Sequence, residues 1–323
     1  MQTLFQSSKA YRLIKTEYQA NKLSHAYLLL LDDARNLRFV LKTFAKIFFL
    51  EDKTPTERER IEKLIDTESF SDCLIFPAEK DKKLKVEDAE KILEESVLTP
   101  VEGDKKLFLI GDFAEANIQT QNKLLKLLEE PPKGVYFLLG ATSSYSVLTT
   151  VLSRVKKLEI NGFEPHILTE ALQRIYGEKY EINALSLCAA ASDGNLGKAQ
   201  NMLEGGYYKN LLTSAFELCL CEPHKLPTAV KQISETKRQK EFLSVLRLIF
   251  RDALVLKTQA KESQNLLLQA EKATLCEVAK LYPPRALLFA QEAISAAEKQ
   301  IFTNANFGQC LEICIAKIKK ENE

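Results

Sequence analysis

Five short apolar runs alternate with longer amphipathic segments over residues 1–161 of this 323-residue chain. Such runs, bounded by polar or turn-forming residues, are typical of strands buried on both faces. Their alternation with helix-length segments is typical of a parallel sheet with crossover helices. The sequence therefore predicts an α/β domain here. The expected strands are residues 26–31, 73–76, 107–111, 135–139 and 158–160, and the expected helices include residues 36–49, 54–66 and 86–96.

From residue 162 onward the strand signal stops, and nearly every apolar pattern has the period of an α-helix. Glycine-containing breaks at residues 193–198 and 205–206 separate a small helical domain, residues 162–206, from a helical domain over residues 207–323. We expect four or five amphipathic helices in this last domain. The expected breaks between them lie near residues 222–223, 225–227, 261–264 and 282–284.

Composition excludes several classes of protein. The net charge is +1 with acids and bases mixed throughout, so strong nucleic-acid binding by the chain alone is not expected. No apolar stretch reaches the roughly 18 to 20 residues that span a bilayer, and the N-terminus lacks the features of a secretory signal. We therefore expect a cytoplasmic protein without a membrane segment. The seven cysteines, an odd number within mostly apolar patterns, favour buried reduced thiols over disulfides.

Residues 107–160 carry the most specific pattern. An apolar run, an acidic turn and a leucine-rich helix precede Pro131-Pro132, so Glu130 is expected to end the helix and Gly134 to allow the turn into the next strand. A strand–helix–strand unit of this kind is common by itself. Much rarer is its combination of Asn-Lys-Leu-Leu-Lys-Leu-Leu-Glu-Glu-Pro-Pro at 122–132 with Leu-Ser-Arg at 152–154. With this combination the chain resembles the AAA+ clamp-loader family of bacterial DNA polymerase III, in its delta-prime branch.

The resemblance extends to residues 24–29, 98–106 and 194–199. It implies a RecA-like AAA+ domain at residues 1–161, a small helical lid at 162–206 and a helical collar for oligomerisation at 207–323. It also implies a role in DNA replication within a hetero-oligomer. The implied partners are gamma/tau motor subunits and a delta subunit, with the sliding clamp and primed DNA reached through the assembly.

The family's Ser-Arg-Cys motif appears here as Ser153-Arg154-Val155. The resemblance implies that Arg154, with Ser153 in the same motif, is an arginine finger that reaches the nucleotide of a neighbouring motor subunit. A guanidinium suits this role because it is permanently charged and its fork pairs two phosphate oxygens. The alternative is an ordinary surface arginine that bonds the last carbonyls of a helix. Val155 replaces the cysteine of the family's motif, and a buried thiol at that position would contribute only to packing.

Two departures from active relatives indicate a catalytically silent chain. Residues 31–38 stand where a phosphate loop is expected but contain no glycine or lysine; Asp32 and Asp33 would repel a triphosphate, and Leu37 takes the place of the lysine. Gly111 and Asp112 stand in place of the acidic pair that serves magnesium and water. We therefore expect no intrinsic ATPase, cofactor or metal. Asp112 could also be a lone catalytic carboxylate, but an acidic residue that ends a buried strand is far more often a turn former or helix cap.

Other polar residues have structural interpretations. His25 is expected to begin a strand and make a structural hydrogen bond, and Lys198 to start a helix. Residues 50–72 contain no cysteine, so the zinc module of many relatives is not expected. Two other functions remain open: a diverged motor subunit with its own ATPase activity, which predicts ATP binding by the isolated chain, and an autonomous DNA-binding module, which predicts salt-sensitive DNA binding.

Overall fold

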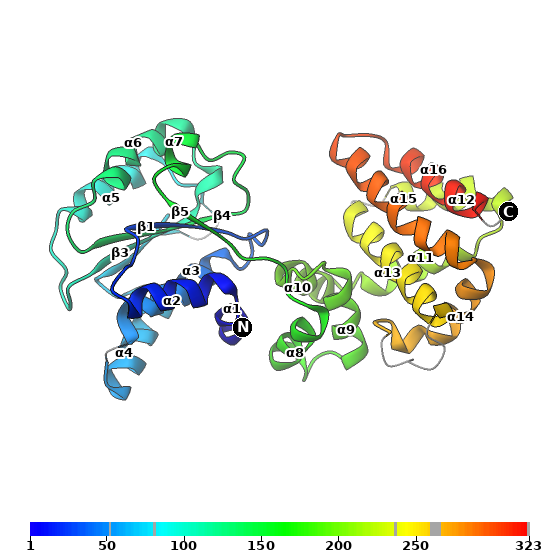
Figure 1. Ribbon diagram of the computed structural model, residues 1–323, viewed down its shortest axis with the longest axis horizontal. Coiled ribbons are helices and arrows are strands. Elements are labelled where there is room, and N and C mark those ends of the chain that lie inside the picture. Colours follow the sequence, from blue (N-terminus) through cyan, green and yellow to red (C-terminus); the bar gives the residue numbers. More distant parts are fainter. Residues whose placement is uncertain (52, 80–81, 236–237, 259–265, 322–323) are drawn as a thin grey trace. The chain divides into compact units, whose positions relative to one another are not determined.

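The computed structural model describes residues 1–51, 53–79, 82–235, 238–258 and 266–321 (Figure 1). The chain divides into two compact units, Met1–Gly162 and Phe163–Glu323. The first unit contains a sheet, whereas the described part of the second is built from helices. In the described part of the chain, no helix combines the length and the apolar character needed to span a bilayer.

The first unit is built on a five-stranded parallel sheet in the order β2-β3-β4-β1-β5. The strands are β1 Ala26–Leu30, β2 Cys73–Phe76, β3 Lys106–Asp112, β4 Val135–Ala141 and β5 Lys156–Glu159. Strand β1 lies between β4 and β5, with Leu28 opposite Leu139 on one side and Lys157 on the other. The predicted α/β fold with a parallel sheet is confirmed.

The prediction for the last strand was wrong in its bounds. Strand β5 covers Lys156–Glu159 rather than residues 158–160, and only Leu158 of its side chains is buried. An edge strand needs to bury just one face, so the apolar-run criterion for fully buried strands missed Lys156 and Lys157. Strands β3 and β4 also extend beyond the predicted runs, whereas β2 has the predicted bounds.

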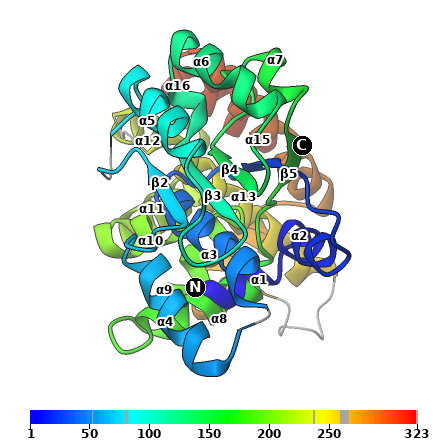
Figure 2. The same cartoon turned by 90° about the vertical axis from the view of Figure 1, so that its left-hand side faces the viewer.

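Helices cover both faces of the sheet (Figures 1 and 2). On one side lie α1 Gln2–Gln6, α2 Lys9–Gln19, α3 Leu37–Leu50 and α4 Pro55–Asp66. On the other lie α5 Val86–Ser96, α6 Ile118–Glu129 and α7 Thr149–Leu152, with the 3₁₀ turn η1 Phe113–Glu115 after β3. Local sequence sets their starts: Thr54 and Glu57 form a capping box at α4, and Asn117 caps α6.

A stack of three phenylalanine rings, one from each of three adjacent strands, runs through the core between the sheet and α5 and α6. The Phe108 centroid lies 6.4 Å from that of Phe76 and 5.4 Å from that of Phe137. Burying each ring stabilises the fold by about 2 to 3 kcal/mol. This core fixes the strands whose ends carry the candidate functional residues.

The described part of the second unit contains only helices. They are α8 Pro165–Tyr176, α9 Ile182–Ala191, α10 Leu196–Gly205, α11 Tyr208–Leu220, η2 Pro223–Lys225, α12 Leu226–Ser234, α13 Gln239–Thr258, η4 Gln269–Glu271, α14 Lys272–Leu281, α15 Pro284–Phe302 and α16 Phe307–Lys320. Gly194 and Gly206 adopt positive φ at the breaks that flank α10, as the glycine pattern predicted. The Ser244 hydroxyl on α13 donates to Asp193, 2.8 Å away, which ties the α9–α10 turn to the later helices.

The expected number of helices after residue 206 was too low, because α11 to α16 make six within the described residues. The breaks at 222–223 and 282–284 are confirmed, and 261–264 lies outside the described residues. The break at 225–227 was wrong, since α12 begins at Leu226 with Pro227 in its first turn. A break at 303–306 was missed, although Asn304 has positive φ and Asn306 caps α16.

Candidate functional site

The loop between β1 and α3 occupies the position of a phosphate loop, at the carboxyl end of a central strand. The Leu31 amide donates to the Ala141 carbonyl of β4 at 3.0 Å. Asp33 is 4% exposed, and its carboxylate accepts from the Asn36 amide at 3.1 Å and from the Asn36 side chain at 2.7 Å. The loop is therefore held by its own side chains, in a place where a phosphate loop turns its backbone amides toward a ligand.

Leu37 fills the place expected for the phosphate-binding lysine. It is the first residue of α3 and is 3% exposed. A Cβ atom added at Gly140 of β4 would lie 2.9 Å from Leu37 Cδ1, so the two residues are in close contact. The position thus carries an apolar contact between helix and sheet.

Asp112 serves as a cap, as expected. At the end of β3 its carboxylate accepts from the Ala114 amide at 3.2 Å. It also accepts from the Thr142 amide at 3.2 Å and the Thr142 hydroxyl at 2.7 Å. Both carboxylate oxygens are thereby used to join the ends of two neighbouring strands.

Arg154 lies on the turn between α7 and β5, with 29% of its side chain exposed. Its Nε and Nη2 donate to Glu129 Oε2 at 3.1 and 3.0 Å. Its Nη1 donates to the Thr150 carbonyl at 2.9 Å and to the Ser153 hydroxyl at 3.2 Å. The bond to Thr150 is the one expected of an arginine that ends a helix, and the pair with Glu129 at the end of α6 is additional to it.

Gln121 of α6 holds the segment that leads to Arg154, and sequence reasoning missed it. This side chain is 1% exposed, and its Nε2 donates to the carbonyls of Ala116 at 3.0 Å and Ser146 at 2.9 Å. Its Oε1 accepts from the Leu148 amide, the N-cap residue of α7, at 2.9 Å. On the other side of Arg154, Val155 is buried in the core, as expected for a packing position.

His25 fixes the end of α6 that carries Glu129. Its Nε2 donates to the Leu128 carbonyl at 2.8 Å, and its own carbonyl accepts from Phe137 of β4 at 2.8 Å. The predicted structural hydrogen bond of His25 is therefore confirmed. The segments 24–29, 122–132 and 152–154, which stood out in the sequence, are thus joined through α6.

A second cluster beside this turn was not predicted. The Tyr27 hydroxyl donates to Glu17 Oε2 at 2.6 Å, and Lys156 of β5 forms an ion pair with the same carboxylate. Burial by itself raises the pKa of Glu17, but the hydrogen bonds from Lys156 and Tyr27 hold it below its ordinary value. The cluster anchors α2 to β1 through Tyr27 and to β5 through Lys156.

The remaining polar candidates have structural roles. The backbone amide of Lys198 donates to the Asn195 cap of α10 at 2.9 Å, which confirms its place at a helix start. His166 and His224 are exposed beside Glu164 and Glu222. Among the described residues, no three His, Cys, Asp or Glu side chains are grouped to hold a metal ion.

All seven cysteines are free thiols. Burial is confirmed for five of them and was wrong for two, Cys221 and Cys276, which are half-buried. The buried five are Cys73, Cys188, Cys219, Cys310 and Cys314. Burial raises the pKa of Cys188 to about 12, which makes a nucleophilic role unfavourable there.

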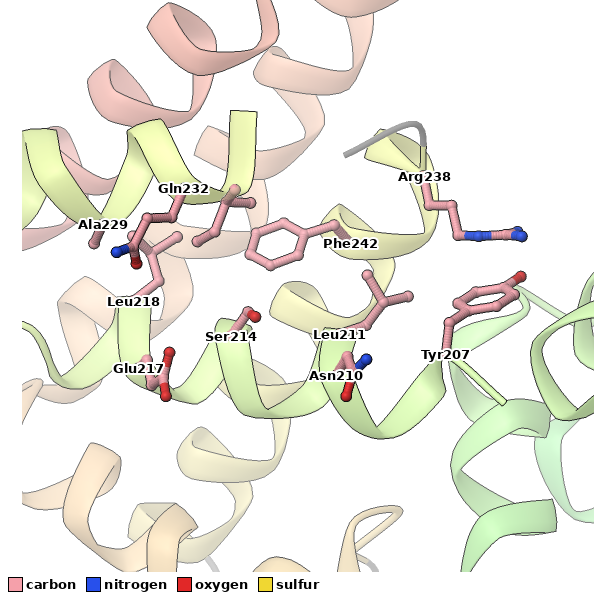
Figure 3. Close-up of a pocket in the computed structure, with 11 residues that line it drawn as sticks. Tyr207, Asn210, Leu211, Ser214, Glu217, Leu218, Ala229, Gln232, Arg238 and Phe242 are labelled. Atoms are coloured by element: carbon pink, nitrogen blue, oxygen red, sulfur yellow. The ribbon is translucent and has the colours of Figure 1, made fainter. Parts of the chain in front are cut away.

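A pocket of about 330 Å³ lies in the second unit between α11, α12 and the start of α13 (Figure 3). Leu218 and Phe242 contribute apolar surface to it, and the Arg238 guanidinium carbon lies 3.4 Å from the centre of the Tyr207 ring. Among its described lining residues, Arg238 and Glu217 are the charged ones. The pocket therefore lacks the group of cations that a triphosphate requires.

The strand order, the strand–loop–helix at β1 and the helical second unit together define a protein of the AAA+ class. Residues 6–164, nearly the whole first unit, match the family profile described as DNA polymerase III, delta subunit. The match over this unit fits a member of the clamp-loader family of DNA polymerase III.

Relatives of this chain are named as subunits of the same polymerase. The tau subunit of Escherichia coli K12 is 32% identical over 125 residues, which are 38% of this chain and 19% of the relative. The delta' subunit of Bacillus subtilis is 26% identical over 166 residues, which are 51% of this chain and 50% of the relative. The chain thus spans between about a fifth and a half of the length of these two relatives.

Solved structures similar to this chain include one named for DNA polymerase III and one named for a DNA clamp loader. A gamma subunit-related protein of Thermotoga maritima has a TM-score of 0.42 at 17% identity, covering 96% of this chain and 99% of the other. The clamp loader delta protein of Bacillus subtilis has a TM-score of 0.35 at 10% identity, with the same two coverages. No residue assignment follows from likenesses this low.

Proposed function

We propose that this chain is a catalytically silent clamp-loader subunit of the delta-prime type, which acts in the cytoplasm as part of a hetero-oligomer. Its partners are gamma/tau motor subunits and a delta subunit, and the assembly loads the sliding clamp onto primed DNA. Nucleotide and magnesium lie on the motor partner, to which this chain donates Arg154 with Ser153 in support. Residues 162–206 form the lid and residues 207–323 the collar.

The β1–α3 loop is the observation that carries this proposal. A phosphate loop needs glycine flexibility, a lysine and amides turned toward the ligand. Here the buried Asp33 carboxylate bonds Asn36, and Leu37 packs against Gly140. A triphosphate placed there would meet a negative charge and no lysine.

The turn at Arg154, in contrast to this loop, carries a positive charge. Its guanidinium is partly exposed, and its turn is fixed from inside by Gln121 and Val155. A permanently charged fork on a rigid turn is suited to stabilise charge that develops on a phosphoryl group of a neighbour.

A motor subunit with its own ATPase is the second candidate, because several relatives with about a third of residues identical are named tau or tau/gamma subunits. It predicts that the isolated chain binds ATP. Titration calorimetry of the chain with magnesium and ATP distinguishes the two candidates. Heat of binding at micromolar ATP would favour the motor, and its absence the silent subunit.

The test of the proposed function is the ATPase of a loader reconstituted with gamma/tau, delta, clamp and primed DNA. Arg154→Ala is compared with the natural chain after equal assembly is confirmed by gel filtration, and Arg12→Ala, an exposed arginine on α2, is the matched control. Removing a finger costs about 10³-fold or more at the site it serves, so that one site should fall silent. Equal rates for Arg154→Ala and Arg12→Ala would contradict donation in trans.

A further inference from the structure

The guanidinium of Arg154 is already occupied by its own chain. A guanidinium has five N–H donors. Nε gives one to Glu129, Nη2 gives one to Glu129, and Nη1 gives two, to Thr150 and Ser153, so four of the five are engaged. The edge formed by Nε and Nη2 faces the Glu129 carboxylate. That edge is one of those through which a guanidinium pairs two oxygens of a phosphate.

We infer that Glu129 is an intrachain competitor of the partner's nucleotide: it holds Arg154 in the free subunit and releases it when a phosphate of the neighbour takes its place. This inference rests on the proposed function of Arg154 and adds the regulation of that residue. The same edge cannot bond a carboxylate and a phosphate at once, so engagement of the partner requires the ion pair to open.

The position of Glu129 supports a role toward Arg154 rather than toward the helix. Glu129 is the last residue of α6, and a carboxylate there is unfavourable because the C-terminal end of a helix carries partial negative charge. The backbone at this point is held, since His25 donates to the Leu128 carbonyl. The Glu129 side chain, in contrast, is 57% exposed, so rotation of the side chain alone opens the pair.

The ion pair between Glu129 and Arg154 is weak enough for a phosphate to replace the carboxylate. An ion pair at this level of exposure changes an equilibrium by about five-fold or less. A phosphate carries more charge than a carboxylate and lies in a drier interface, so it outcompetes Glu129. Once Arg154 is engaged, the Glu129 charge beside the triphosphate is repulsive. Both effects predict that neutralising Glu129 favours engagement.

The experiment compares four reconstituted loaders: natural, Glu129→Gln, Arg154→Ala and the double variant. Without clamp and DNA, Glu129→Gln should raise the ATPase by about two- to five-fold. It should have no effect when Arg154 is alanine. Glu130→Gln, the adjacent exposed carboxylate, is the matched control and should leave the rate unchanged.

The outcomes separate the two ideas. If Arg154→Ala lowers the rate but Glu129→Gln leaves it unchanged or lowers it, the competitor role is wrong and the finger stands. If Arg154→Ala has no effect, the finger and the competitor role fall together. In the isolated full-length chain, Glu129→Gln should also speed exchange of the Arg154 Nε proton measured by ¹⁵N NMR. Equal exchange in both chains would overturn the competitor role.

Discussion

Replacing Gln121 with leucine should loosen the Arg154 turn while leaving the sheet intact. The side chain is 1% exposed and makes three hydrogen bonds, to Ala116, Ser146 and Leu148. Each contributes about 0.5 to 1.5 kcal/mol net, and leucine has a similar volume but neither donates nor accepts. Since the two bonds to the 146–148 segment are only partly buried, water replaces them in part. We expect the local stability of that segment to fall by about 2 kcal/mol.

The assay is amide hydrogen exchange of the full chain followed by mass spectrometry. A local loss of about 2 kcal/mol corresponds to roughly 30-fold faster exchange in peptides covering residues 146–152. Gln119→Leu is the matched control, because Gln119 lies two residues earlier on the same helix and is exposed. Unchanged exchange at 146–152, or equal acceleration across β3 and β4, would refute the reasoning that Gln121 holds this turn specifically.

Two further predictions concern the first unit. The side-chain hydrogen bond from Arg38, aided by Lys42, lowers the pKa of Glu68 from about 4.5 to about 2, so its stabilisation is present above the ordinary pKa and is lost as the pH falls toward 2. The difference in unfolding free energy between the natural chain and Glu68→Gln should shrink over that range in urea titrations. Leu37→Lys should destabilise the fold by roughly 2 to 4 kcal/mol without creating ATP binding, because it buries a charge against Gly140; thermal unfolding and calorimetry with ATP check both parts.

The parts of the fold that could be predicted are those whose signal is local. Strand β2 and helix α5 have the bounds that their apolar patterns indicated. Helix α2 was not predicted because its composition is mainly polar, although Ser8 caps it. Strand β5 was misplaced because three of its four side chains are polar and exposed, as an edge strand that buries only one face allows. Local pattern thus predicts buried elements better than those at the margin of the sheet.

The contacts of the candidate site also divide into local ones, which the sequence indicates, and distant ones, which it does not. The absence of glycine and lysine in the β1–α3 loop is visible in the sequence, and the Asp33–Asn36 bond spans only three residues. The pair of Glu129 with Arg154 joins residues 25 apart, and that of Glu17 with Lys156 joins residues 139 apart. Such pairs depend on which strands are neighbours, and no local periodicity encodes that order. They required the structure.

Under the proposed function, nucleotide binding and arginine donation rest on different parts of this unit, and this would explain how one is lost while the other persists. A phosphate loop depends on the residues between β1 and α3, where Asp33 and Leu37 now make internal contacts. The Arg154 turn depends instead on Gln121, His25 and Glu129 around α6. The partners of Asp33 and Leu37 given above, Asn36 and Gly140, lie outside α6. Under the proposed function, a subunit that no longer binds ATP therefore keeps the geometry needed to act on a neighbour's.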